Sequence, residues 1–482
     1  LKMHIIWVIG IAIVSACVIS GTVQFQFDEE MLLLDIPNAE NYIAKAATYW
    51  GQAQRRKEVF ARHGHTNWDK TASSIKEWGQ IGFIPGYGKP EEDQFSGYVS
   101  VGPPGNQKHL FYYLIGVDPA KPLLWWMQGG PGSSSLFGAF AEIGPYEVLA
   151  DMKVVDRPES WHNDANLLFV DNPVGTGFSF PDDPSSFDHY QTDVSRDLML
   201  FLEVFYQRHS SLQTSDLFIF GESYGGKYAP TVAKTILDFN RNPGHDFKIP
   251  LKGIACGNGW THPQIQVAHY VDFAFANGLI DERQSETSSR MTSAIVEQIQ
   301  GHNYTGAAQN WDSLVNYIQN CSANFSIYNV RDFTPEESLP FYAWLNRQDV
   351  RVAFHVGNVS WNCDSDSVMS ALQDDIMRSA FPAMKQVLGE VRVLVYNGGD
   401  DFICNLIGTE NVYRSQEWPG RENYLNQHHR PWYNSKNEVA GFVRVGEKLT
   451  QLSVNGAGHM VPASQPSNAR QMMRTFINNR DF

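Results

Sequence analysis

The sequence predicts an α/β protein with a doubly wound, mostly parallel sheet and a helical insertion over it. Short apolar runs, of the kind that form buried strands, alternate along the chain with segments of helical spacing. One of these runs leads through a tight Gly-x-Ser-x-Gly turn into a helix at residues 216–238. The alternation stops near residue 261 and resumes near residue 391, which indicates an insertion.

Residues 1–22 are typical of a secretory signal peptide. An apolar stretch at residues 5–19 follows Lys2 and His4, and small polar residues come after it. Its length and flanks suit a signal peptide better than a transmembrane helix. Residues 23–84 have a mixed composition, and we expect an N-terminal extension or a removable pro-segment there.

Residues 85–260 are predicted to form the first part of the core. It opens with a hairpin, in which a Gly-Pro-Pro-Gly-Asn turn joins two β patterns. Apolar runs then predict buried parallel strands, and residues 193–206 have helical spacing. The expected strands are residues 95–101, 109–115, 122–127, 166–170, 217–220 and 251–256.

The insertion is placed at residues 261–382, where helical patterns continue without strands. We expect this segment to form a lid over the active site. Residues 383–482 then complete the core, with strands at 391–396 and 449–454 and a final helix at 468–477.

Composition and charge restrict the classes of partner. The 482 residues carry 37 Lys+Arg and 52 Asp+Glu, a net charge of −15, so nucleic acid and anionic membrane surfaces are unsuitable partners. Hydrophobic residues make up 43% and charged residues 18%, as in globular proteins. No second stretch approaches membrane length, and we expect no stable membrane insertion.

The cysteines are few. Removing Cys17 with the signal peptide leaves Cys256, Cys321, Cys363 and Cys404. Four cysteines allow two disulfides in three pairings, or one disulfide with two free thiols. We predict a Cys321–Cys363 disulfide, because both lie in the insertion, and a free Cys404. No Cys-x-x-Cys or Cys/His spacing indicates a metal, and no cofactor is expected.

Four N-x-S/T sequons indicate a lumenal or extracellular route. They begin at Asn303, Asn320, Asn324 and Asn358, all within the insertion. Asparagines in this pattern accept N-glycans in proteins that enter the secretory pathway. We therefore expect a secreted or a lysosomal/vacuolar protein.

The segment at residues 216–238 carries the strongest chemical signal. The apolar run Leu-Phe-Ile-Phe is followed at once by Gly-Glu-Ser-Tyr-Gly, residues 221–225, and then by a helical pattern. Strand, Gly-x-Ser-x-Gly and helix together form a nucleophile elbow, whose small residues permit a tight turn that exposes the serine Oγ. We predict that Ser223 is a catalytic nucleophile. The alternative is a strand-to-helix turn without chemistry.

A glycine-rich loop, Gln-Gly-Gly-Pro-Gly-Ser-Ser-Ser, follows the expected strand at residues 122–127. Because no side chain blocks their approach, Gly129 and Gly130 can donate amide hydrogens to a developing oxyanion. The alternative is a tight turn without a ligand. A phosphate-binding loop is excluded, because no GK[ST] follows.

A serine nucleophile needs a base to remove its proton and an acid to orient that base. Among the 15 histidines, His459 stands in a glycine-flanked loop just past the final strand. Asp400 and Asp401 both follow the strand at residues 391–396, and the residues alone do not choose between them. The order Ser, acid, His is that of the α/β-hydrolase fold.

Several longer motifs extend from about residue 95 to the end of the chain. They are LLWWMQGGPGSSS, FVDNPVGTGFSF, FGESYGGKYAP, GNGWTHP, VYNGGDDFICN and GAGHMVP. Together these motifs resemble those of the serine carboxypeptidases of the carboxypeptidase Y and cathepsin A type. The resemblance is greatest to the vitellogenic-like branch found in animals.

This resemblance implies roles for residues at matching positions. It makes Ser223 the nucleophile, Asp401 the acid and His459 the base, with the backbone amides of Gly130 and Tyr224 as oxyanion donors. It places the terminal carboxylate of the substrate at Gln128, Gly129, Glu142 and Glu222, and makes Cys404 and Met460 pocket residues. Two buried carboxyl groups at hydrogen-bond distance are expected to share a proton and to bind that carboxylate best in acid.

Two positions depart from the family pattern. Gln128 replaces an asparagine, which keeps the amide group but lengthens its reach. Ser133 replaces a cysteine, so one common disulfide of the family cannot form. Cys363 resembles the usual partner of that cysteine and is left without it.

The expected activity is that of a serine-type carboxypeptidase. It would release single C-terminal residues from peptides and proteins at acid pH through an acyl-enzyme. One alternative is an acyltransferase of the same fold. An assay that compares hydrolysis of a blocked dipeptide with transfer of the acyl group from an acyl glucose would distinguish the two activities. The other is a binding or stabilising protein, against which the intact Ser, His and Asp set counts. Peptide or protein C-termini are the expected partners, and a homodimer is left open.

Overall fold

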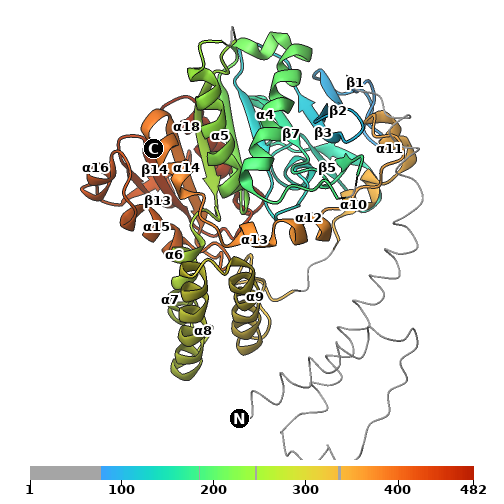
Figure 1. Cartoon of the computed structure of the whole chain (residues 1–482). Coiled ribbons are helices and arrows are strands. Elements are labelled where there is room, and N and C mark those ends of the chain that lie inside the picture. Colours follow the sequence, from blue (N-terminus) through green and yellow to red (C-terminus); the bar gives the residue numbers. More distant parts are fainter. Residues whose placement is uncertain (1–77, 184, 245–246, 335–337) are drawn as a thin grey trace, which may run out of the picture. The chain divides into compact units, whose positions relative to one another are not determined.

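The computed structural model describes residues 78–482, apart from residues 184, 245–246 and 335–337 (Figure 1). The expected signal peptide at residues 1–22 and most of the expected extension at residues 23–84 lie outside these residues. All described residues belong to one compact unit, Trp68–Phe482. None of the helices formed by the described residues is long and apolar enough to cross a membrane.

A 12-stranded sheet forms the centre of this unit. Its six inner strands run parallel, and the strands at both edges are antiparallel. In spatial order the strands are β1 (Trp78–Gln80), β2 (Gln94–Val101), β3 (Lys108–Ile115), β7 (Asn166–Val170), β4 (Leu123–Met127), β9 (Leu217–Glu222), β10 (Leu251–Gly257), β11 (Arg392–Gly398), β14 (Leu449–Val454), β13 (Val439–Val445) and β12 (Arg430–Tyr433), with β8 (Phe180–Pro181) beside β3. The predicted doubly wound, mostly parallel fold is confirmed.

The central strands β7, β4 and β9 read as nearly continuous apolar runs because both faces of the sheet are covered there. Successive side chains of β4 show this directly: Trp125 and Met127 belong to the core on one face, and Leu124 and Trp126 to the core on the other. All four are fully buried. A one-sided sheet would show polar residues at alternate positions instead.

Helices cover the two faces. The helices α4 (Gln191–Arg208), α5 (Gly225–Arg241) and α14 (Phe381–Glu390) contribute to the core that contains Trp125. The helix α18 (Pro466–Ile477) contributes to the core that contains Trp126. Figure 1 shows α4 and α5 side by side in front of the sheet. Because α14 packs on α5, it is part of the core layer although it begins at the expected end of the insertion.

The segment expected to be the insertion divides into three regions. The helices α7 (Tyr270–Ala276), α8 (Glu282–Gln300) and α9 (Tyr304–Cys321) project away from the sheet (Figure 1). The helices α10 (Pro340–Leu345) and α11 (Gln348–Ala353) instead bury their apolar residues in the core that contains Trp126. The short helices α12 (Asp366–Ala371) and α13 (Gln373–Ile376) connect this second region to α14.

The predicted Cys321–Cys363 disulfide is wrong. All four cysteines of the described residues are free thiols, so the expectation of a free Cys404 is confirmed. Cys321 ends α9 and packs on the core of one sheet face, whereas Cys363 packs on the core of the other face. Although both cysteines lie in the expected insertion, the fold places their side chains on opposite faces of the sheet.

Candidate active site

Five neighbouring parallel strands each place one residue of the site at their C-terminal ends. Gln128 follows β4, Glu222 ends β9, Asn258 follows β10, Asp401 follows β11 and His459 follows β14. The carboxyl ends of parallel strands meet at one edge of a sheet, which is where open α/β sheets bind ligands. Residues spread over the chain are thus gathered at a single edge.

Ser223 occupies the turn between β9 and α5. Its φ of 59° lies in the left-handed region, which is uncommon for a residue other than glycine. The turn needs small neighbours: a Cβ on Gly221 would come within 2.2 Å of the Gly225 carbonyl oxygen, and a Cβ on Gly225 within 2.6 Å of that of Met127. This geometry is that of the predicted nucleophile elbow.

The glycine-rich loop after β4 lies directly against this turn. A Cβ on Gly129 would come within 2.5 Å of the backbone nitrogen of Tyr224 and 2.6 Å of the Cβ of Ser223. The next residue, Gly130, has a φ of 102°, a conformation that glycine adopts without strain. The two segments that carry the expected oxyanion donors therefore pack directly against each other beside Ser223.

His459 and Asp401 form a buried pair. The ring atom Nδ1 of His459 lies 2.9 Å from Oδ2 of Asp401, and the two side chains are 3% and 0% exposed. Asp400 points elsewhere, since its Oδ1 accepts a hydrogen bond of 3.0 Å from Nε of the exposed Arg331. The structure thus brings Asp401, and not Asp400, to the histidine.

Asn258 holds this carboxylate from the neighbouring strand. Its Nδ2 donates to Oδ2 of Asp401 at 2.6 Å, and its Oδ1 accepts from the amide of Gly398 at 3.1 Å. The amide of Ile403 donates to the other carboxylate oxygen at 3.1 Å. The GNGWTHP motif contains Asn258, but the sequence analysis assigns it no role. Its position in a Gly-Asn-Gly loop directly after a strand was the feature that could have identified it as a site residue.

A residue of the insertion positions His459 from the other side. The carbonyl of Tyr328 accepts a hydrogen bond from the His459 amide at 2.7 Å, and the two rings lie 5.1 Å apart. Within the described residues Ser223 Oγ forms no hydrogen bond with His459. Catalytic hydrogen bonds are often long before substrate binds and tighten in the complex.

Glu222 and Glu142 form a buried acidic pair beside the elbow. Glu142 ends the short π-helix η2 (Gly138–Glu142), and its carboxyl group interacts with that of Glu222. Burial raises the pKa of Glu142 to about 7. Burial, and then the charge of Glu142, raise the pKa of Glu222 well above its usual value. Such a pair retains a proton under conditions in which exposed glutamates are ionised.

Gln128 supports this pair through its side-chain amide. Its Nε2 donates to Oε1 of Glu222 at 2.7 Å, and its Oε1 accepts from Nε1 of Trp126 at 2.8 Å. No donor among the described residues reaches Oε2 of Glu222 or either carboxyl oxygen of Glu142. Buried polar atoms are rarely left without a partner, so a proton held between the two carboxyl groups is the donor that these oxygens require.

The two expected pocket residues flank the acid and base. The buried Cys404 offers its Sγ within 4.8 Å of ligand atoms of Asp401 and His459. Burial raises the pKa of its thiol well above the usual value, so the group is a neutral thiol. The half-buried Met460 directly follows His459. The ligand atoms of Asp401, Cys404 and His459 are close enough together to face one metal ion, but Asp401 and His459 already bind each other.

Comparisons with known proteins agree with this arrangement. Residues 85–479 match the family model described as serine carboxypeptidase. A probable serine carboxypeptidase CPVL of Dictyostelium discoideum is 36% identical over 80% of this chain and 79% of its own length. The Homo sapiens protein of that name is 34% identical, over 83% and 86%. A venom serine carboxypeptidase of Apis mellifera is also 34% identical, over 80% and 85%.

A solved structure extends the likeness to three dimensions. It is that of a prohormone-processing carboxypeptidase, Kex1, from Saccharomyces cerevisiae. The TM-score is 0.73 at 25% sequence identity, and the match covers 80% of this chain and 92% of the yeast chain.

Proposed function

Because the chain belongs to the serine carboxypeptidase family, we propose that Ser223, Asp401 and His459 are the catalytic triad of this carboxypeptidase. The chain is a serine-type carboxypeptidase, a hydrolase of peptides. The acyltransferase alternative is not favoured, since the relatives reported above are named as carboxypeptidases. The finer proposal is that it removes single C-terminal residues at acid pH, through an acyl-enzyme on Ser223.

The proposed reaction has two steps. His459 removes the proton of Ser223 Oγ, which attacks the last peptide carbonyl while the amides of Gly130 and Tyr224 stabilise the oxyanion. The same proton then passes to the leaving nitrogen, the C–N bond breaks, and the C-terminal residue departs. Water deprotonated by His459 next attacks the ester and releases the shortened peptide, which regenerates the Ser223 hydroxyl.

The acidic pair beside Ser223 carries the proposal that cleavage occurs at the C-terminus. A protonated Glu142–Glu222 pair can donate a hydrogen bond to the terminal carboxylate of a peptide, whereas the ionised pair repels it. The hydrogen bond from Nε2 of Gln128 to Oε1 of Glu222 supports this proposal, because it holds the pair beside the nucleophile Ser223. The acid preference follows, because the pKa of Glu142 is raised to about 7 and that of Glu222 is also raised.

We expect KM for peptides with a free C-terminus to rise as the pH increases through about 7, the value to which burial raises the pKa of Glu142. A peptide with a C-terminal amide carries no charge for the pair to repel, so its KM is expected to change little. The measurement is KM over pH 4–9 for a matched acid and amide substrate.

Glu142→Gln and Glu222→Gln are expected to weaken acid-pH binding of the free peptide by about 1–3 kcal/mol, and of the amidated peptide by less. Glu147→Gln is the matched control, because Glu147 is exposed in the strand β5 (Tyr146–Val148). Superimposable pH profiles for the acid and amide substrates would disprove the role of the pair.

We also propose that the protein follows the secretory route, to the outside or to a lysosome-like compartment. All four sequon asparagines are exposed, so each is accessible to a glycan. Expression of the full chain in animal cells should yield a product whose mass decreases on enzymatic removal of N-glycans. An unchanged mass would contradict this route. The homodimer stays a prediction, which the molar mass in solution would test.

A further inference from the structure

We propose that Asp375 is a positioning residue for the oxyanion hole, acting within a strap at residues 363–376 that contacts both oxyanion-donor segments. This strap is the part of the insertion that contains α12 and α13. The inference rests on the proposed function, which assigns the oxyanion donors to the amides of Gly130 and Tyr224. The strap explains what holds those two amides in place.

The first end of the strap is paired with the glycine-rich loop. Ser133 and Asp364 form an antiparallel bridge, and Oγ of Ser133 donates to Oδ1 of Asp364 at 2.5 Å. On either side, the Ser134 amide donates to the Cys363 carbonyl at 2.7 Å and the Ser365 amide to the Gly132 carbonyl at 3.0 Å. Three hydrogen bonds therefore fix the loop that follows Gly130.

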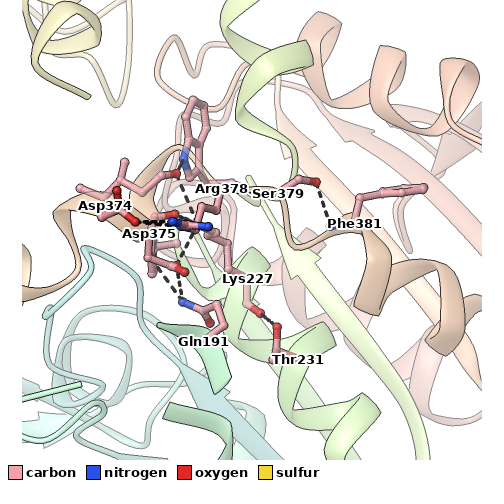
Figure 2. A network of polar contacts seen from close by, with 11 residues as sticks. Gln191, Lys227, Thr231, Asp374, Asp375, Arg378, Ser379 and Phe381 are labelled. Carbon is pink, nitrogen blue, oxygen red and sulfur yellow. Dashed lines mark hydrogen bonds and ion pairs between the residues drawn. The ribbon is translucent and has the colours of Figure 1, made fainter. Parts of the chain in front are cut away.

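The second end of the strap is anchored at the elbow by Asp375. Its Oδ2 accepts from the hydroxyl of Tyr224 at 2.5 Å, from Nε2 of Gln191 at 2.8 Å and from Nζ of Lys227 at 3.0 Å. Lys227 also donates to the carbonyls of Asp375 and Ile376. In Figure 2 Asp375 faces both Gln191 and Lys227, and Lys227 reaches toward it from α5.

The ion pair in this network is almost completely buried. The side chains of Lys227 and Asp375 are 1% and 4% exposed. Burial lowers the pKa of Lys227, while the charge of Asp375 opposes the change. Burial also disfavours the charge of Asp375, yet Lys227 and the donor from Tyr224 hold its pKa below the usual value. Each charge thus depends on the other, and removing one leaves an uncompensated buried charge.

The network connects the strap to the backbone that carries the second donor. Tyr224 is held at its hydroxyl by Asp375, and Nζ of Lys227 lies 4.8 Å from the centre of its ring. Trp260 adds a second connection, since its Nε1 donates to the Ile376 carbonyl at 2.9 Å and its amide to the Ser223 carbonyl at 2.7 Å. A shift of the strap would therefore move the amide of Tyr224.

An oxyanion donor acts on charge that develops only in the transition state. Misplacing such a donor lowers kcat and leaves KM unchanged, because the ground-state complex does not use it. This signature distinguishes a positioning role from a structural one. A structural role would lower the amount or the Tm of folded enzyme, without changing kcat per active site.

The test compares Asp375→Leu, Lys227→Met and the double variant. Each single variant leaves a buried charge unpaired and is expected to lower Tm, whereas the double variant leaves none and should recover much of it. The double variant is nevertheless expected to show kcat about 10- to 100-fold below wild type, with KM within about twofold, because Tyr224 has lost its anchor. Affinity for a peptide aldehyde, whose adduct presents an oxyanion, should fall in parallel with kcat.

The matched control makes the same two substitutions on the exposed pair of α5, Lys234→Met with Asp238→Leu. Nζ of Lys234 lies 2.6 Å from Oδ2 of Asp238, so the two are also in direct contact, but their side chains are 36% and 47% exposed. A fluorophosphonate counts active sites in every sample. If wild type reacts with it and the double variant keeps wild-type kcat per site, the positioning proposal is overturned. If wild type itself is neither labelled nor active, the proposed function fails instead.

Discussion

Replacing Ser223 with alanine is expected to lower kcat for peptide hydrolysis by about 10⁶-fold, because no other group can form the acyl-enzyme. Folding should be preserved. The Ser223 hydroxyl forms no hydrogen bond within the described residues, and alanine removes only this one oxygen from a half-buried residue. Tm and the circular dichroism spectrum should therefore match those of wild type.

The measurement is hydrolysis of a blocked dipeptide with a free C-terminus, together with labelling by a fluorophosphonate. Wild type should be labelled at one serine, identified as Ser223 by peptide mapping, and the variant should not be labelled. A folded Ser223→Ala protein that keeps most of its activity would rule out the triad.

Replacing Asp401 with asparagine is expected to lower kcat by about 10⁴-fold. A carboxylate accepts a hydrogen bond from Nδ1 of His459 and so keeps Nε2 free to take the serine proton. An asparagine can instead donate to Nδ1 and favour the wrong tautomer. Both carboxylate oxygens already accept hydrogen bonds, Oδ2 from Nδ2 of Asn258 and Oδ1 from the Ile403 amide, so the NH2 group of an asparagine would face a donor in either orientation.

The neighbouring residue provides the control. Asp400→Asn makes the same chemical change one position earlier, where the carboxylate pairs with the exposed Arg331. Surface pairs of this kind contribute about 0–1 kcal/mol to stability, and this one touches no proposed catalytic group. We expect kcat within about twofold of wild type. Equal losses in the two variants would show that the acid is assigned wrongly.

The inner strands could be predicted because their signal is local. A strand buried on both faces is mostly apolar, and the observed β7 (Asn166–Val170), which is fully buried and apolar after its first residue, has the predicted bounds. The antiparallel hairpin of β12 and β13 lacks this signal, because exposed and buried residues alternate in it. Sequence reasoning did not place these two edge strands.

The candidate site likewise has one part that depends on neighbouring residues and one part that depends on residues far apart in the chain. The elbow around Ser223 is set by steric limits between residues close together in the chain, such as Gly221 and Gly225, so its motif is readable in sequence. The choice between Asp400 and Asp401 is not local. It depends on Asn258, Arg331 and His459, which come from other strands and from the insertion.

Lys227 shows the limit of sequence reasoning most clearly. A lysine within an amphipathic helix is normally solvated, yet this one is buried against Asp375, 148 residues later in the chain. The sequence by itself determined the parallel sheet, the elbow and the family, because apolar periodicity and tight turns depend on neighbouring residues. The residues alone left Asp400 and Asp401 open, and the family resemblance chose Asp401. Only the tertiary structure gave the contacts that bring Asp401 to His459, placed the cysteines apart and joined the strap to the oxyanion segments. Each of these depends on distances between residues that the chain itself does not keep close.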